Sequence, residues 1–273
     1  GKLFLDPGDV VLCESPSYLG ALNAFNAYQP KFVEVPTDNG GLIPEELDKI
    51  LSTTPNCKFI YVIPDFQNPT GRTWSMERRQ KFMEVVNKHN LPVLEDNPYG
   101  ELRYEGTILP SLKSMDTKGL VMFLGTFSKI FCPGLRLGWI AAEHSLLSEF
   151  VKIKQSADLH TSNFDQGVAD AYMEQYDLDA HVKEIVALYK HRRDLILESM
   201  EKYFPAGTEW THPEGGLFLW LTFPEGVSAR KVFNKCIEMK VAGVIGDAFY
   251  PNQKTDRSMR INYSNMPDDR IVE

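Results

Sequence analysis

The stretch GTFSKIFCPGLRLGW, residues 125–139, places one lysine among apolar residues. Thr126 and Ser128 precede Lys129, and Arg136 follows it. Lysine is seldom buried without a partner. A desolvated lysine near a second cation has a lowered pKa, which leaves more of it as the free, nucleophilic amine. Such an amine can form an imine with an aldehyde, so Lys129 is the first candidate catalytic residue.

Other polar side chains follow the remaining apolar runs of the chain. They are Tyr18 after VVLCESP, Asn68 after KFIYVIP, and Asp96 with Tyr99 after LPVLE. No single motif is decisive, because NPTG around Asn68 also makes a good plain turn. Tyr18 could equally be core packing, since aromatic residues are common beside apolar strands. The set in this order is far more specific than any member.

The chemistry of this set suits pyridoxal phosphate, which has an aldehyde, a ring nitrogen, a phenolic oxygen and a phosphate. Lys129 can form the imine, and Asp96 can hold the ring nitrogen protonated, so that the ring stays an electron sink. Asn68 and Tyr99 can donate hydrogen bonds to the phenolic oxygen.

The phosphate and the ring face need partners of their own. Thr126, Ser128 and Arg136 can hold the phosphate, Arg136 as a bidentate fork. For Ser128, a local bond to the backbone is an equally good reading. Tyr18 can stack on the ring.

Strands and helices that alternate along the first 160 residues would position these side chains. Apolar runs at 58–64, 91–96 and 120–128 indicate strands, and 75–90 has a helical period with Ser75 as a possible cap. Such runs, separated by helices, are typical of a mostly parallel sheet covered on both faces. Ligands bind beyond the carboxyl ends of the strands in these sheets. We therefore expect the polar residues to converge on one rim.

The rest of the chain changes character. Helical patterns cover roughly 144–158 and 165–203, and they are followed by a strand at 215–223, a helix at 228–240 and a strand at 258–264. The predicted fold class is α/β: a mostly parallel, mixed sheet flanked by helices on both faces, with a smaller C-terminal α+β domain. We expect a large domain over 1–190, which includes the start of a long connecting helix, and a small domain over 191–273.

Composition excludes several classes of protein. The 273 residues carry a net charge of −8, which argues against nucleic acid as a partner of this segment. No apolar run is long enough to predict a membrane span. The cysteines lie far apart and the histidines show no metal-ligand spacing, so we expect neither disulfides nor a metal site. A reducing cytoplasm fits best.

The chain resembles the fold-type-I, class I pyridoxal-phosphate-dependent aminotransferases, in the branch of the 2-aminoadipate, kynurenine and multi-substrate enzymes. The resemblance covers essentially the whole chain. Its markers are FQNPTG, EDNPYGELRY, GTFSKIFCPGLRLGW, KQSADLHTSNFDQ, PEGGLFLW and MRINYS.

The resemblance assigns a role to each candidate. It implies that Lys129 binds the cofactor covalently as an aldimine and that Arg260 grips the substrate α-carboxylate beside Asn68. The cofactor-binding residues that it implies are Tyr18, Asn68, Asp96, Tyr99, Thr126, Ser128, Lys129 and Arg136. It also implies amino-group transfer between an L-amino acid and a 2-oxo acid, with 2-oxoglutarate as the expected acceptor, in a homodimer with shared active sites.

Some alternatives stay open at this point. The same residues serve pyridoxal-phosphate β-lyases, and some GntR-type transcription regulators carry an aminotransferase-like domain behind a DNA-binding domain. Arg260 could also be part of a structural ion pair. The family's Gly-Ser-Gln phosphate-binding segment is missing, and we expect the chain to be a fragment that lacks an N-terminal segment and a C-terminal end. The sequence does not identify the preferred amino donor.

Overall fold

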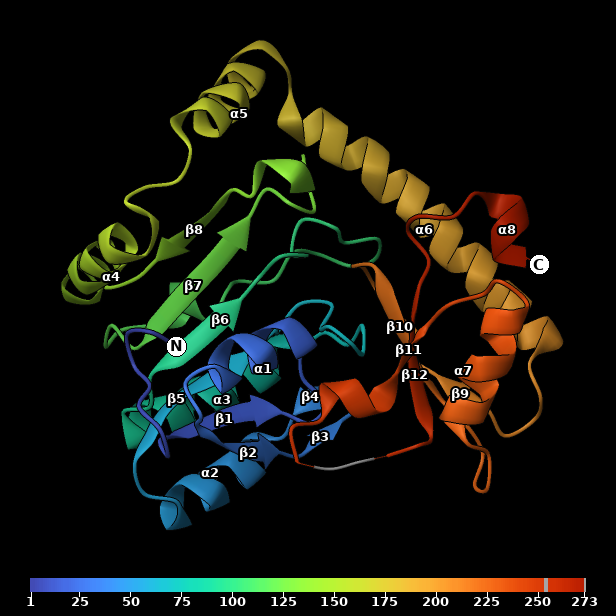
Figure 1. The fold of residues 1–273 in the computed structure, drawn as a ribbon, viewed down its shortest axis with the longest axis horizontal. Helices are drawn as coiled ribbons and strands as arrows, with labels where there is room; N and C mark the ends of the chain where they lie inside the picture. The colour runs from blue at the N-terminus through green and yellow to red at the C-terminus, as the bar shows by residue number, and fades with distance from the viewer. Residues whose placement is uncertain (253–254, 273) are drawn as a thin grey trace.

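A six-stranded sheet forms the larger part of the computed structural model, which describes residues 1–252 and 255–272 (Figure 1). The strand order is β2-β1-β5-β6-β7-β8. The strands are β1 (Val10–Glu14), β2 (Lys31–Val35), β5 (Cys57–Val62), β6 (Val93–Asp96), β7 (Val121–Thr126) and β8 (Gly138–Ala141). All neighbours are parallel except β7 and β8, which are antiparallel. The prediction of a mostly parallel, mixed sheet is confirmed.

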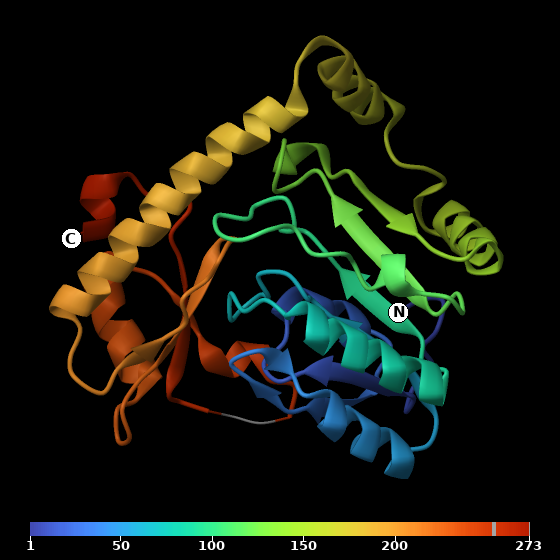
Figure 2. The ribbon, with the colours of Figure 1, turned by 180° about the vertical axis from the view of Figure 1, so that it is seen from behind.

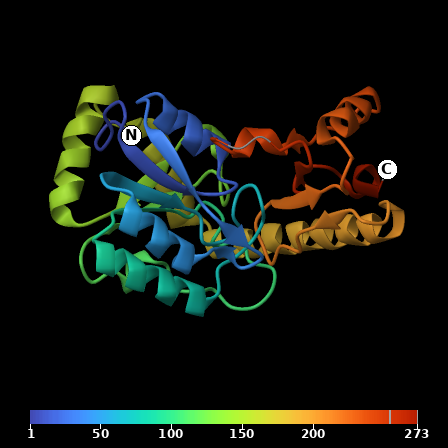
Figure 3. The same cartoon turned by 90° about the horizontal axis from the view of Figure 1, so that it is seen from below.

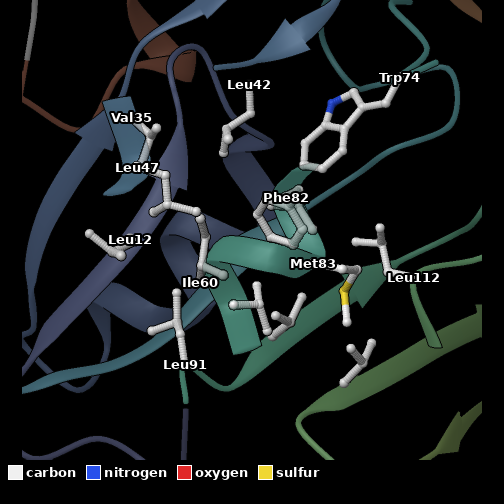
Figure 4. Packing of buried hydrophobic residues seen from close by; sticks show 14 residues of the cluster. Leu12, Val35, Leu42, Leu47, Ile60, Trp74, Phe82, Met83, Leu91 and Leu112 are labelled. Atoms are coloured by element: carbon white, nitrogen blue, oxygen red, sulfur yellow. The ribbon is translucent and has the colours of Figure 1, made fainter. Parts of the chain in front are cut away.

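Helices cover both faces of this sheet because successive strand residues point to opposite sides. Leu12 and Ile60 join a core with α2 (Pro44–Thr53) and α3 (Met76–His89), which Figure 4 shows from close by. Their neighbours in the strands pack instead against α1 (Leu19–Asn26). Figure 3, seen from below, shows α1 on one face and the pair α2 and α3 on the other.

Local signals in the sequence set the ends of α3. Ser75 precedes the helix, and its hydroxyl accepts a hydrogen bond from the Arg78 backbone N–H at 3.2 Å. Asn90 ends the helix in the left-handed conformation, with φ of 50°. Asparagine tolerates this conformation better than most residues. The predicted cap at Ser75 is confirmed.

A smaller sheet in the order β11-β12-β10-β9 forms the second part of the molecule. Its elements are β9 (Glu209–Trp210), β10 (Phe218–Thr222), α7 (Ala229–Glu238), β11 (Val244–Ile245), β12 (Ser258–Asn262) and α8 (Asp268–Val272). The long helix α6 (Leu178–Tyr203) leads from the larger part to this sheet, as Figure 2 shows from behind. The remaining elements are β3 (Thr37–Asp38), β4 (Gly41–Leu42), three short 3-10 helices, α4 (His144–Asp158) and α5 (Asn163–Gln175).

The pattern over 165–203 forms two helices, α5 and α6. Between them, the Asp177 side chain accepts a hydrogen bond from the Ala180 N–H at 3.0 Å and so begins a new helix. An aspartate at this position satisfies a backbone N–H that has no partner within the helix. Within the described residues, no helix combines the length and apolar character that a membrane span needs.

Candidate active site

One cavity of about 420 Å³ brings together all the site residues that the sequence predicts. It is lined by Tyr18, Ile63, Asn68, Asp96, Pro98, Tyr99, Thr126, Ser128, Lys129, Arg136, Phe218 and Arg260. Most of these lie at or just after the carboxyl ends of β1, β5, β6 and β7. The expected rim of the sheet is therefore where the polar groups gather, and Arg260 on β12 adds a cation from the smaller sheet.

Lys129 lies half-buried in the turn after β7. Burial is the main cause that lowers the pKa of its amine, and the positive charges of Arg136 and Arg260 lower it further. Among the described residues, none forms a hydrogen bond or an ion pair with this amine. The lowered pKa agrees with the expectation from the sequence and leaves the amine available as a nucleophile or base.

Asp96 is the last residue of β6, and its carboxylate lines the cavity. Burial raises its pKa to about 6, although a hydrogen bond from Tyr61 opposes this rise. The Tyr61 hydroxyl donates to Oδ2 of Asp96 at 2.5 Å. At neutral pH the carboxylate is thus largely charged, as an anion that holds a protonated ring nitrogen has to be.

Asn68 connects the two parts of the molecule at the cavity. Its side-chain oxygen accepts a hydrogen bond from Arg260 Nη1 at 2.8 Å, and its Nδ2 donates to the Tyr99 hydroxyl at 3.3 Å. Asn68 and Tyr99 are both buried. The predicted neighbours Asn68, Tyr99 and Arg260 therefore form one hydrogen-bonded group.

Two aromatic rings hold the guanidinium of Arg260. Its Cζ lies 4.2 Å from the ring centre of Phe218 and 5.1 Å from that of Phe249. Cation–π contacts of this kind keep a guanidinium in place while its edge stays available. Within the described residues, the buried Nε of Arg260 has no hydrogen-bond partner. Arg260 can therefore bind a carboxylate without breaking an existing ion pair.

Hydroxyls and one guanidinium gather beside Lys129. Thr126 Oγ1 lies 3.0 Å from Ser128 Oγ and accepts a hydrogen bond from the Ser128 N–H at 3.1 Å. Arg136 Nη1 lies 3.5 Å from Ser128 Oγ and donates to the Pro133 carbonyl at 3.0 Å. Arg136 adopts φ of 53°, the left-handed conformation, which turns the chain from the Lys129 loop into β8. Ser128 thus makes both the local contacts and the contact toward Arg136.

A buried carboxylate supports the loop that carries Asn68. Glu14, at the end of β1, accepts hydrogen bonds from the Ile63 N–H at 3.1 Å and from Trp74 Nε1 at 3.2 Å. Gln67 extends this support, because its Nε2 donates to the Pro16 carbonyl at 2.8 Å and its Oε1 accepts from the Thr70 N–H at 2.9 Å. The loop between β5 and α3 is therefore fixed at both ends.

Three residues that contribute to this arrangement are absent from the sequence-based set. They are Tyr61 behind Asp96, and Phe218 and Phe249 around Arg260. Each is an aromatic residue in or near an apolar run, which gives the same signal as ordinary core packing.

The donors and acceptors at the cavity fit pyridoxal phosphate. A free amine, a carboxylate, an amide with a phenol, and hydroxyls with a guanidinium correspond to its aldehyde, ring nitrogen, phenolic oxygen and phosphate. The Nε–H of Arg260, which has no hydrogen-bond partner among the residues that the structure describes, adds a donor for a substrate carboxylate. No group of three or more potential metal ligands occurs in the part of the chain that the structure describes.

Comparisons with known proteins agree with this chemistry. The family model for aminotransferase class I and II matches residues 2–273. Aromatic-amino-acid aminotransferase 1 of Thermococcus litoralis is 42% identical over the whole chain, which covers 66% of that protein. The 2-aminoadipate transaminase of Thermus thermophilus is 33% identical, again over the whole chain and 69% of its own length. The chain thus spans about two thirds of these relatives.

A solved structure has the same fold. The kynurenine aminotransferase of Pyrococcus horikoshii, solved in complex with PMP, superimposes with a TM-score of 0.95 at 41% identity. The match covers 99% of this chain and 68% of that one. The arrangement described above is therefore that of a known fold, the one that the sequence predicts.

Proposed function

The chain belongs to the class I and II aminotransferase family, and on that premise we propose that the protein transfers an amino group between an L-amino acid and a 2-oxo acid. The observation that carries this proposal is the single cavity in which Lys129 lies with Asp96, Asn68 and Arg260. The family and the PMP complex of the Pyrococcus enzyme indicate pyridoxal 5′-phosphate as the cofactor. When bound, this cofactor supplies an aldehyde for the amino group and an electron sink for the Cα carbanion.

Lys129 has two tasks in this proposal. Its amine, with a lowered pKa, binds the cofactor covalently and, once released, takes the proton from the substrate Cα. A base works best when its pKa lies near the working pH, and burial beside two arginines moves Lys129 in that direction. Once protonated, the same amine would deliver this proton to the cofactor carbon that bears the amino group after the transfer.

Other residues of the chain bind and orient. Arg260, held by its aromatic neighbours and Asn68, binds the α-carboxylate and so directs the Cα–H bond toward Lys129. Asp96 would hold the ring nitrogen of the cofactor, Asn68 and Tyr99 would donate to its phenolic oxygen, and Tyr18 would pack on its ring. Thr126, Ser128 and Arg136 would hold the phosphate.

Assembly and location belong to the same proposal. We propose a homodimer in which each active site includes residues from the other chain. Within one chain, we propose a domain boundary near residue 190, inside α6. The four cysteines of the chain, all within described segments, are free thiols, which suits a reducing cytoplasm.

The aminotransferase interpretation is favoured over a transcription-regulator domain, because the two transaminases reported above are 42% and 33% identical to the chain, whereas an HTH-type transcriptional regulator of Bacillus subtilis is 30% identical. A panel of amino donors with 2-oxoglutarate tests it, with glutamate as the measured product and Lys129→Ala as the inactive control. Release of pyruvate and ammonia without glutamate would instead show a β-lyase. Specific DNA binding without turnover of any donor would show a regulator.

A further inference from the structure

We propose that Tyr61 is a positioning residue for Asp96: its hydroxyl fixes one carboxylate oxygen, so that the other is left for the ring nitrogen of the cofactor. The inference rests on the proposed function, because it assigns Asp96 to that nitrogen. Tyr61 acts through Asp96 and is not a catalytic residue.

Tyr61 is positioned behind the cavity. Tyr61 lies on β5 and pairs with Leu94 of the neighbouring strand β6, two residues before Asp96. Its side chain is 2% exposed and is not part of the cavity lining, whereas Asp96 is. The hydroxyl donates to Asp96 Oδ2 at 2.5 Å. Hydrogen bonds to a charged carboxylate are typically this short.

The packed core holds the Tyr61 ring in place. Its ring lies in the core cluster under α1, where the Phe25 ring is 5.6 Å away at an interplanar angle of 71°. Edge-on aromatic pairs of this kind fix the ring orientation. The Tyr61 hydroxyl, which donates to Asp96, is therefore held in place by the core of the large sheet.

Two buried carboxylates outside the cavity, those of Glu95 and Glu14, differ from Asp96 in their hydrogen bonds. Glu95 uses both of its oxygens to accept the N–H groups of Leu112 and Lys113, and Glu14 uses both of its oxygens for Ile63 and Trp74. Neither lines the cavity. Asp96, in contrast, receives a hydrogen bond only from Tyr61 within the part of the chain that the structure describes. One oxygen is held and one remains free.

The direction of the hydrogen bond is also fixed. Burial and the charge of Asp96 hold the pKa of Tyr61 well above its usual value. The phenol therefore stays protonated and donates, which favours the charged form of Asp96. Loss of the hydroxyl would leave the carboxylate both less fixed and more easily neutralised.

Cofactor binding measures this effect without any turnover. The cofactor-free full-length protein is titrated with pyridoxal phosphate and with its deaza analogue, in which a carbon replaces the ring nitrogen. The ratio of the two dissociation constants reports the contact at the ring nitrogen alone. We expect the wild type to prefer pyridoxal phosphate by about tenfold or more, which corresponds to about 1.4 kcal/mol. Tyr61→Phe should reduce this preference by about three- to tenfold.

Two controls make the result specific. Tyr263→Phe removes a hydroxyl of equal burial that donates to the Gly215 carbonyl at 3.2 Å, and it should leave the preference unchanged. In an Asp96→Asn background, Tyr61→Phe should have no further effect on the ratio. Tyr61→Met, which also lacks the hydroxyl, repeats the test if the phenylalanine variant folds poorly.

The outcomes separate the inference from its premise. Equal weakening of both ligands in Tyr61→Phe, or no weakening of either, would overturn the role of Tyr61 while Asp96 keeps its own. Equal binding of both ligands by the wild type would overturn the assignment of Asp96 to the ring nitrogen, and with it the inference. Retained preference in Tyr263→Phe with reduced preference in Tyr61→Phe supports the inference.

Discussion

At the residue scale, burial moves the pKa values of Lys129 and Asp96 in opposite directions. The amine of Lys129 loses protons more easily than usual, and the carboxyl of Asp96 holds its proton up to a pH of about 6. Titratable groups perturbed by burial and by specific partners cluster at functional sites. Above pH 6 the cavity therefore holds a charged carboxylate together with an amine that loses its proton more easily than an ordinary lysine.

Removal of one positive charge tests the environment of Lys129. Arg136→Gln should raise the pKa of Lys129, because Arg136 lowers it, but only in part, since burial is the larger cause. The pH at which trinitrobenzenesulfonate half-labels Lys129 in the cofactor-free protein should therefore move upward. Peptide mass spectrometry gives the labelled fraction. Arg230, which lies in the smaller part of the chain and pairs with Asp247, provides the control: Arg230→Gln should not change the pH of half-labelling. If Arg136→Gln also leaves this pH unchanged, the charge of Arg136 does not lower the pKa of Lys129.

Replacement of the Asp96 carboxylate tests its role as an anion. Asp96→Asn should keep the fold and bind the cofactor but slow removal of the Cα proton by roughly 100-fold or more, because a preorganised charge is lost. Single-turnover mixing with a saturating amino donor measures this step. Glu95→Gln, which changes a buried carboxylate outside the cavity, should reduce stability and leave the step nearly unaffected. An unchanged rate in Asp96→Asn would show that the Asp96 carboxylate has no part in this step.

The polar part of the site could be predicted from the sequence, and its aromatic support could not. Lys129, Asp96 and Asn68 follow apolar runs, and strand ends in a parallel sheet meet at one edge. Tyr61 and Phe218 lie inside such runs, where an aromatic residue packs in the core in most proteins. Only the three-dimensional structure shows that the Tyr61 hydroxyl meets Asp96 and that the Phe218 ring meets Arg260.

At the element scale, the strands and helices with a strong pattern were predicted, and the weakly patterned ones were not. The runs that became β5, β6 and β7 are nearly all apolar, so their existence was clear. The short strands β3 and β9 have two residues each and carry no periodicity. They form because neighbouring segments align them, which is a property of the packed molecule rather than of the local sequence.

The junction between β1 and the Asn68 loop has a consequence for stability. Burial raises the pKa of Glu14 to about 7, against an ordinary value of 4.5. The folded protein therefore binds this proton more tightly than the unfolded chain, and stability falls as the pH rises through about 5 to 8. In Glu14→Gln, the free energy of unfolding should fall by about 2 kcal/mol less than in the wild type over this pH range.

Denaturant unfolding of the cofactor-free protein at pH 5 and pH 8 measures the effect. The variant itself should be less stable at pH 5, because an amide nitrogen cannot accept the hydrogen bond that Glu14 accepts from Ile63 or Trp74. Only the difference between the two pH values is diagnostic. Glu77→Gln, on an exposed surface beside Lys81, is the control and should keep the wild-type difference. If the stability of Glu14→Gln changes between pH 5 and pH 8 as much as that of the wild type, Glu14 is not the cause.

At the scale of the whole molecule, the helices beyond β8 have few buried residues. In α4 none is buried and in α5 only Ala169 is. Large apolar side chains are exposed on these helices and the adjoining loops, including Val151, Leu159, Phe164 and Met173. Figure 1 shows both helices at the periphery of the large sheet. An exposed apolar surface of this kind is typical of a protein–protein interface.

The proposed homodimer accounts for such a surface. Light scattering on the full-length protein at micromolar concentration should give the mass of two chains, with an obligate interface of roughly 2,000 Å² or more. Phe164→Glu, which places a charge on this surface, should shift the mass toward one chain, whereas Ile108→Glu on an exposed loop of the large sheet should not. A stable and active monomer would refute the proposal.

The central claim is that Lys129 is the residue that binds the cofactor covalently. Borohydride reduction of the protein loaded with pyridoxal phosphate, followed by proteolysis and peptide mass spectrometry, tests it most directly. The account predicts that the added mass of the reduced cofactor is found on Lys129, in the peptide that also contains Ser128, and that Lys129→Ala carries none. Label on another lysine, or no label in cofactor-saturated protein, would contradict it.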